Sequence, residues 1–264
     1  MKLAALTLFL SLALVTGGCV VSLDSQSAKE SFDQTFPLSA GGEVVIDNVN
    51  GAVRVATWDR AEVRVEAEKK ARGGDSEAAR RRLAAAAIDI DNQPDRITVK
   101  TRNTKSGSGF FGWIGGHGGA TTVNYTITIP ARAELSAKTV NGAVTVRDLV
   151  GRVVAETVNG SIEVHGVVGT VAAETINGGI DVAMTAFTGD RSLDLSTVNG
   201  GISLSLPAET QASLDASVTN GGIDCDLPLS RQEKSRRHLR GELGGGGPAI
   251  KLETTNGGID ILAR

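Results

Sequence analysis

Short runs of alternating apolar and polar residues recur along this chain, and each run flanks an Asn-Gly pair. Residues 156–164, ETVNGSIEV, have close copies in KTVNGAVTV, ETINGGIDV, STVNGGISL, SVTNGGIDC and ETTNGGIDI. Alternation with period two predicts β-strands, and Asn-Gly predicts a tight change of direction. Consecutive pairs from residue 141 to residue 220 are 18, 18, 22 and 21 residues apart, which predicts an array of stacked repeats. The asparagines are Asn50, Asn141, Asn159, Asn177, Asn199, Asn220 and Asn256.

The apolar positions around each Asn-Gly pair test whether it forms a hairpin or a solenoid corner. In a two-residue hairpin at Asn159, Val158 would face Ser161 and Ile162 would face Thr157. The apolar residues of the two strands would then lie on opposite faces, which prevents burial and excludes a two-residue hairpin. A three-residue loop pairs these two but places charged residues opposite apolar ones. A solenoid corner avoids the conflict and is the prediction.

Stacked in register, the repeats form three apolar columns with rungs ~4.8 Å apart. The columns would fill a narrow interior, the glycine would take the corner where a positive φ is needed, and the asparagines would hydrogen-bond between rungs. The predicted fold is all-β, a single-stranded parallel β-helix over residues 36–264 with one inserted short α-helix. The column before Asn reads Val49, Val140, Val158, Ile176, Val198, Thr219 and Thr255. The columns three and five residues after Asn begin with Val53, Val144, Ile162, Ile180 and with Val55, Val146, Val164, Val182.

Two insertions interrupt the array between residues 50 and 141. DSEAARRRLAAAA, about residues 75–87, predicts a helix capped by Asp75 or Ser76 that covers an end or flank of the solenoid. A glycine-rich loop over residues 106–120 carries candidate partner contacts at Phe110, Phe111 and Trp113. The alternative is that these aromatic residues fold back over an open end of the solenoid.

A basic loop over residues 230–247 is the next insertion. Its arginines include the candidate contacts Arg236, Arg237 and Arg240, which could bind anionic lipid headgroups or an acidic polysaccharide. A solvated loop between rungs is the ordinary alternative for such a charge run.

The N-terminus has the pattern of an export signal. Residues 1–18 combine a basic start with an apolar run too short to span a bilayer, which predicts a signal peptide. Cys19 resembles the lipidated cysteine of bacterial lipoproteins, although Thr16 departs from the usual Leu. Residues 19–35 then predict a lipidated, flexible tether. This predicts a cell-envelope protein held to the membrane by lipid, at the outer membrane if the source is Gram-negative. An ordinary signal peptide with a chance cysteine is the alternative.

The charge balance excludes some partners. The net charge of −3 becomes −4 when Lys2 leaves with residues 1–18, and this mildly acidic balance gives no sign of nucleic-acid binding. Lipidation of Cys19 would leave Cys225 without a disulfide partner, at alternating spacing between Ile223 and Leu227, so a buried small apolar role is predicted.

No catalytic constellation or cofactor motif is visible. The histidines His117, His165 and His238 lie in unrelated segments, so neither a metal site nor a catalytic triad is predicted. Outward carboxylates on adjacent rungs could bind Ca²⁺, but a solvated polar face is the simpler interpretation. These carboxylates are Glu163, Asp181, Asp224 and Asp260.

The segments YTITIP, AELSAKTVNGAVTVRDLVGRVVAETVNGSIEV and KSRRHLRGELGGGGPAIKLETTNGGIDI together resemble the DUF4097 family of adhesin-like proteins, related to the GIN-domain adhesin heads. The resemblance extends over nearly all of residues 40–264. It implies a right-handed β-helix on an exported bacterial protein and provides no catalytic residues. The first functional hypothesis is therefore a non-catalytic envelope lipoprotein that presents an adhesive or ligand-binding surface to an envelope protein or glycan. The alternatives are a self-associating envelope scaffold and, third, an enzyme acting on polysaccharide.

Overall fold

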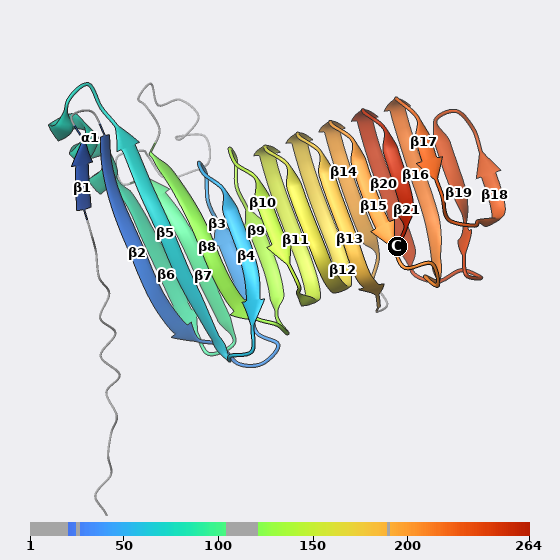
Figure 1. Ribbon diagram of the computed structural model, residues 1–264, viewed down its shortest axis with the longest axis horizontal. Coiled ribbons are helices and arrows are strands. Elements are labelled where there is room, and N and C mark those ends of the chain that lie inside the picture. The colour runs from blue at the N-terminus through green and yellow to red at the C-terminus, as the bar shows by residue number, and fades with distance from the viewer. Residues whose placement is uncertain (1–20, 25–26, 104–120, 189–190) are drawn as a thin grey trace, which may run out of the picture.

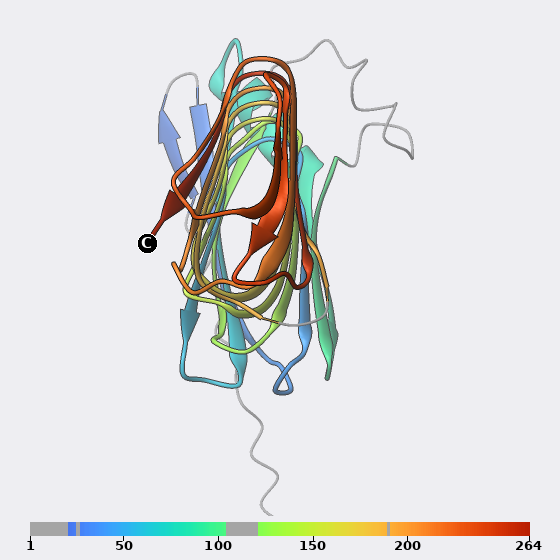
Figure 2. The same cartoon turned by 90° about the vertical axis from the view of Figure 1, so that its right-hand side faces the viewer.

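The computed structural model describes residues 21–24, 27–103, 121–188 and 191–264 and shows an elongated stack of β-rungs (Figure 1). The predicted all-β solenoid with one short helix is confirmed. Along the stack axis the rungs superpose as a narrow, flattened coil with two long sides (Figure 2). The core is therefore a thin layer between two β-faces, which suits the low aromatic content of 3%.

Strands make up most of the described chain, and a short helix interrupts them near the N-terminal end. The first part contains β1 (Val21–Asp24), β2 (Ser27–Pro37), β3 (Glu43–Asp47), β4 (Val53–Trp58), β5 (Glu62–Arg72), α1 (Ser76–Ala85), β6 (Ala86–Gln93), β7 (Arg96–Asn103) and β8 (Thr122–Pro130). The middle contains β9 (Glu134–Lys138), β10 (Val144–Arg147), β11 (Val150–Asn159), β12 (Ile162–Asn177), β13 (Ile180–Phe187), β14 (Leu193–Asn199) and β15 (Ile202–Leu206). The last part contains β16 (Ala212–Asn220), β17 (Ile223–Cys225), β18 (Ser230–Lys234), β19 (His238–Leu243), β20 (Ala249–Asn256) and β21 (Ile259–Ala263).

Each Asn-Gly pair is a corner between two strands of one rung, as predicted. The strands pair in parallel with the same positions of the next rung, so Asn159 lies beside Asn177 and Ile162 beside Ile180. Identical residues therefore stack in columns along the axis. A hairpin would instead pair the two strands of one repeat with each other.

The column before Asn faces outward, and its predicted place in the core is wrong. Val158 is half-buried and Ile176 is 43% exposed, whereas Thr157 and Thr175 are buried. The inward positions ahead of the corner are therefore occupied by threonine. The Thr157 hydroxyl donates a hydrogen bond of 3.0 Å to the carbonyl oxygen of Gly142 on the neighbouring rung. Because this bond satisfies the hydroxyl, threonine can be buried there at little cost.

Because threonine faces inward, the argument that a hairpin would place its apolar residues on opposite faces no longer applies. With Thr157 inward, a hairpin at Asn159 would pair Thr157 with Ile162 on one face, and the inward residues of both strands would then share that face. The predicted solenoid corner is correct, but the evidence for it is the stacking of neighbouring rungs and not the facing of the apolar residues. The same inward threonine and neighbouring glycine recur in the pairs Thr139–Gly51, Thr175–Gly160, Thr197–Gly178 and Thr254–Gly200.

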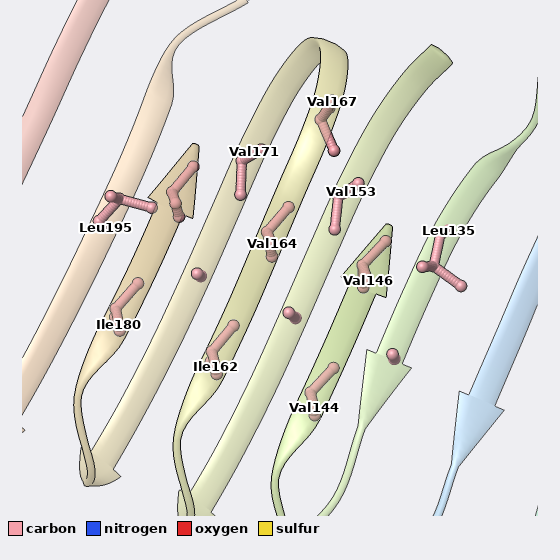
Figure 3. Packing of buried hydrophobic residues seen from close by; sticks show 14 of the residues in the cluster. Leu135, Val144, Val146, Val153, Ile162, Val164, Val167, Val171, Ile180 and Leu195 are labelled. Atoms are coloured by element: carbon pink, nitrogen blue, oxygen red, sulfur yellow. The ribbon is translucent and has the colours of Figure 1, made fainter. Parts of the chain in front are cut away.

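The two columns after the corner are buried as predicted (Figure 3). Val144, Ile162 and Ile180 lie in one row and are at most 2% exposed. Val146 and Val164 lie in the next row and are completely buried. These branched side chains fit the short distance between the two faces.

The asparagine side chains form a continuous ladder of hydrogen bonds along the corner. From the second asparagine onward, each Nδ2 donates to the Oδ1 of the preceding asparagine in the ladder over 2.7 to 2.9 Å. The order is Asn50, Asn141, Asn159, Asn177, Asn199, Asn256 and Asn220. All seven predicted corner asparagines are thus aligned, but the last two are exchanged relative to the sequence.

The exchange arises because the rung made by β20 and β21 lies between two rungs that precede it in the chain. β20 pairs in parallel with β14 on one side and with β16 on the other, and β21 lies between β15 and β17 (Figure 1). The other end shows a similar departure, since β3 lies between β7 and β9. The sequence-based alignment stacked the rungs in the order in which they occur in the chain. This order holds only in the middle of the array.

Antiparallel strands and the helix cover the N-terminal end. Asp75 caps α1 by accepting a 2.6 Å hydrogen bond from the Ala78 amide, as predicted. Ala79 and Leu83 of α1 pack on Ala28 of β2, which covers this end as expected. Residues 27–35 lie in β2 and pair with β5, although their polar composition predicted a tether. Alternate β2 side chains, Phe32 and Phe36 among them, pack against the core, and polar residues between them conceal this pattern.

The single tyrosine of the chain occupies a polar cluster inside the core. Tyr125 is fully buried, and its hydroxyl lies 2.7 Å from Oγ1 of Thr101, which donates to Asn48. Burial raises the pKa of Tyr125 to about 12. The ordinary value is ~10, so the phenol stays protonated in the folded protein at pH values where the unfolded chain has lost this proton.

We expect a corresponding loss of stability at alkaline pH. The stabilisation is fully present below pH ~10 and falls by roughly 2–3 kcal/mol as the pH rises to ~12. Denaturant unfolding at both pH values should show this loss, and a Tyr125→Phe variant should show a smaller one. A phenol absorbance titration with a midpoint near 10 in the folded protein would contradict the expectation.

Candidate interaction surfaces

The predicted basic loop is an antiparallel β-hairpin at the end of the solenoid remote from α1 (Figure 1). β19 pairs with β16, and β18 pairs with β19. Leu239 and Leu243 of β19 are buried and extend the core into this end. The segment is therefore part of the end cap, because its alternating leucines pack inward while its charges face solvent.

Two arginines of the hairpin are already paired with carboxylates. Arg240 Nε lies 3.1 Å from one Asp215 carboxylate oxygen, and His238 Nε2 lies 3.2 Å from the other. Arg231 Nη1 lies 2.8 Å from Oε1 of Glu242. Arg240 was a predicted partner contact, but its charge is balanced by Asp215, which lies 25 residues earlier on β16.

The tip of the hairpin carries cations without such partners. A 2.8 Å backbone hydrogen bond from Ser235 to His238 closes the turn and leaves Arg236 and Arg237 at its two central positions. Both arginines and the preceding Lys234 are exposed, and none has an acidic partner among the described residues. Two of the three predicted basic contacts are thus brought together at an exposed point.

The predicted outward carboxylates form a row on the opposite β-face. Glu163 lies beside Asp181, Ser203 follows, and then come Asp260 and Asp224. His165 Nε2 lies 3.2 Å from an Asp181 oxygen. Over the described residues, no three or more His, Cys, Asp or Glu side chains group into a metal site. A shallow groove of about 260 Å³ is lined by Glu163, Asp181 and Asp260 of this row together with Gly179 and Gly201.

A row of exposed β-branched residues lies beside the asparagine ladder and was not predicted from the sequence. Val198 and Ile176 are 40% and 43% exposed, and Val158 and Val140 continue the row half-buried. The signal in the sequence was the threonine that lies two residues before five of the seven asparagines and occupies the inward position in those rungs.

The remaining predicted site residues are cysteines and aromatics. Cys225 is half-buried beside the core, and burial raises the pKa of its thiol, which disfavours the reactive thiolate. Cys19, Phe110, Phe111, Trp113 and His117 lie outside the described residues. In the described part of the chain no helix is long and apolar enough to cross a membrane.

Similarity to known proteins agrees with this architecture. Residues 151–262 match the Toastrack DUF4097 family. The Toastrack match begins in β11, includes the rungs of Asn159, Asn177, Asn199, Asn220 and Asn256, and contains the basic hairpin. It confirms the predicted resemblance over this segment. The rungs of Asn50 and Asn141 and the helix lie outside it.

Three solved structures show weak similarity over most of the chain. A "putative cell adhesion protein" from Clostridium sporogenes ATCC 15579 is 10% identical with a TM-score of 0.46, covering 88% of this chain and 99% of its own. A "putative adhesin" from Bacteroides fragilis NCTC 9343 is 11% identical with a TM-score of 0.44, covering 89% and 97%. A "putative lipid binding protein" from Parabacteroides distasonis ATCC 8503 is 11% identical with a TM-score of 0.30, covering 88% and 96%. No curated protein matches the chain.

Proposed function

We propose that this chain is an exported, lipid-anchored and non-catalytic envelope protein whose solenoid presents an adhesive tip. The observation that supports the proposal is the pair Arg236 and Arg237, exposed and without acidic partners among the described residues at the end of the hairpin. Arginine binds carboxylate and phosphate oxygens in bidentate geometry, so the tip suits an anionic ligand. The export signal and lipidation at Cys19 remain predictions from the sequence.

The position of the tip favours a ligand away from the anchoring membrane. β1 begins the described chain at the α1 end, and the hairpin lies at the other end (Figure 1). At ~4.8 Å per rung, the ladder from Asn50 to Asn220 separates the two ends by roughly 30 Å. A lipid on Cys19 would hold the α1 end near the bilayer. The proposed ligand is therefore an acidic polysaccharide of the envelope or of a neighbouring surface.

The two alternatives have weaker support. End-to-end assembly would use the outer edge of β18, but this strand is charged, fully exposed and bulged at Arg231, whose φ is +48°. Such features discourage edge pairing. An enzyme would need carboxylates that converge on one point, and Glu163, Asp181 and Asp260 instead lie in a row along the surface.

A binding assay with matched variants tests the tip. We expect the full chain carrying Cys19→Ser to bind polygalacturonate but not neutral dextran, with an affinity that falls as salt increases. Arg236→Ala/Arg237→Ala should weaken binding by about tenfold or more, because two charge-assisted contacts are lost. Arg80→Ala/Arg81→Ala removes the same charge from exposed positions of α1 and should leave the affinity nearly unchanged.

Three results would contradict the proposal. Equal binding by both double variants and the parent would show that the tip makes no contact. Equal weakening by both variants would show a response to total charge alone. Binding to vesicles containing phosphatidylglycerol without binding to polygalacturonate would make the tip a membrane-surface site instead.

A further inference from the structure

The rung made by β20 and β21 occupies a slot whose two walls belong to other parts of the chain. Its asparagine accepts from Asn220 and donates to Asn199 across 36 and 57 residues of sequence. Leu252, Ile250 and Ile261 of this rung are completely buried. Both walls therefore depend on this rung for hydrogen bonds and for apolar packing.

A glycine hinge joins this rung to the preceding hairpin. Residues 244–248 cross the start of β16, because β19 pairs with one edge of β16 and β20 with the other. Gly244, Gly245 and Gly246 have φ values of +56°, +95° and +93°. A Cβ at Gly245 would have no neighbour within 4 Å, so this glycine is not held by packing, whereas the carbonyl oxygens of Gly247 and Pro248 accept hydrogen bonds from Ser213. Glycine segments of this kind can adopt other paths at low cost.

Charges make the slot selective for this rung. Lys251 lies directly between Asp194 of β14 and Asp215 of β16. If the slot closed without the rung, Asp194 would lose the cation that faces it and would lie opposite Asp215, whose carboxylate also contacts Arg240. The arrangement with Lys251 between the two aspartates is therefore favoured. Lys251 also contacts Glu253 at 2.9 Å, and the pKa of Lys251 is raised by Glu253 first and by both aspartates in addition. An empty slot thus favours refilling by a strand of the same sequence.

We propose that β20 and β21 form an exchangeable rung, and that two copies of this chain associate by each inserting this rung into the slot of the other. Every contact of the rung with β14, β15, β16 and β17 is retained in such a dimer, and only residues 244–248 change path. Reciprocal exchange of an identical element is a low-cost route to a symmetric dimer. This inference is independent of the ligand of the hairpin tip.

Disulfide trapping between two different chains tests the exchange. Ser196 and Glu253 are direct partners across the slot wall. In full chains carrying Cys19→Ser and Cys225→Ser, one copy receives Ser196→Cys and the other receives Glu253→Cys. The two are mixed while reduced, incubated at high concentration under native conditions, diluted and oxidised. Facing positions on adjacent strands have the Cα separation that a disulfide needs.

A matched pair provides the control. Lys138 and Glu156 occupy the same outward position on two adjacent rungs, β9 and β11, in the middle of the array. We expect the Ser196→Cys and Glu253→Cys chains to form a mixed disulfide-linked dimer whose yield increases with the concentration during incubation. The Lys138→Cys and Glu156→Cys chains should not form one. Absence of the first mixed dimer, or equal yields from both pairs, would overturn the proposal.

Discussion

Replacing Gly178 with alanine should destabilise the fold severely, while the same replacement at Gly179 should have little effect. A Cβ at Gly178 would lie 2.0 Å from the carbonyl oxygen of Gly160 on the neighbouring rung. The rung spacing is set by hydrogen bonds on both faces, so the backbone cannot move away locally. We expect a loss on the order of 4 kcal/mol, in the range that accompanies severe steric conflict in a core.

Gly179 is the matched control because it is the next residue of the same corner. Its Cβ would lie 3.5 Å from the Gly201 oxygen, an ordinary contact, and Ala143 and Ser161 occupy the same column in earlier rungs. We expect Gly179→Ala to change the free energy of unfolding by less than about 0.5 kcal/mol. Denaturant midpoints of the two variants measure the difference. Similar midpoints would show that close approach of neighbouring rungs does not explain the corner glycine.

The second large effect concerns the two isoleucines on either side of one corner. Ile180 is 2% exposed and faces the core, whereas Ile176 is 43% exposed and faces outward. We expect Ile180→Ala to cost roughly 2–5 kcal/mol through lost burial and a cavity. Ile176→Ala should cost less than about 1 kcal/mol, because much of its side chain already contacts water.

Denaturant unfolding of the two variants distinguishes the observed facing from the one that the apolar pattern predicted. Equal losses would support the predicted facing, in which both residues contribute to the core. A loss confined to Ile180→Ala supports the corner with threonine inside.

Much of the rung geometry could be predicted because the same short motif recurs. Any two repeats aligned on Asn-Gly place Ile162 beside Ile180 and Asn159 beside Asn177, whatever the details of the corner. The facing of Val158 could not be predicted from apolar character alone. Thr157 takes the core position instead. The hydrogen bond from the Thr157 hydroxyl to the Gly142 carbonyl oxygen makes its burial possible, and this bond forms only when the rungs are stacked.

The order of the rungs was not predictable from the motif, because every copy offers the same asparagine and the same apolar columns. The charges that favour the observed order, Asp194, Lys251 and Asp215, lie between these columns. The candidate site could likewise be predicted only in part. Arg236 and Arg237 were recognisable as a basic cluster, but the pairing of Arg240 with Asp215 depends on which strand the hairpin joins.

The asparagine ladder also has a consequence for how the protein folds. From Asn141 to Asn199, neighbouring asparagines are 18 to 22 residues apart in sequence, but the remaining links span 91 residues at one end and 57 and 36 residues at the other. Contacts between nearby segments close faster, since the entropy lost on closing a loop grows with its length. We therefore expect folding to nucleate in the middle rungs and to spread outward. The helix end and the interleaved C-terminal rung would then form in the late, rate-limiting steps, although they lie at opposite ends of the molecule.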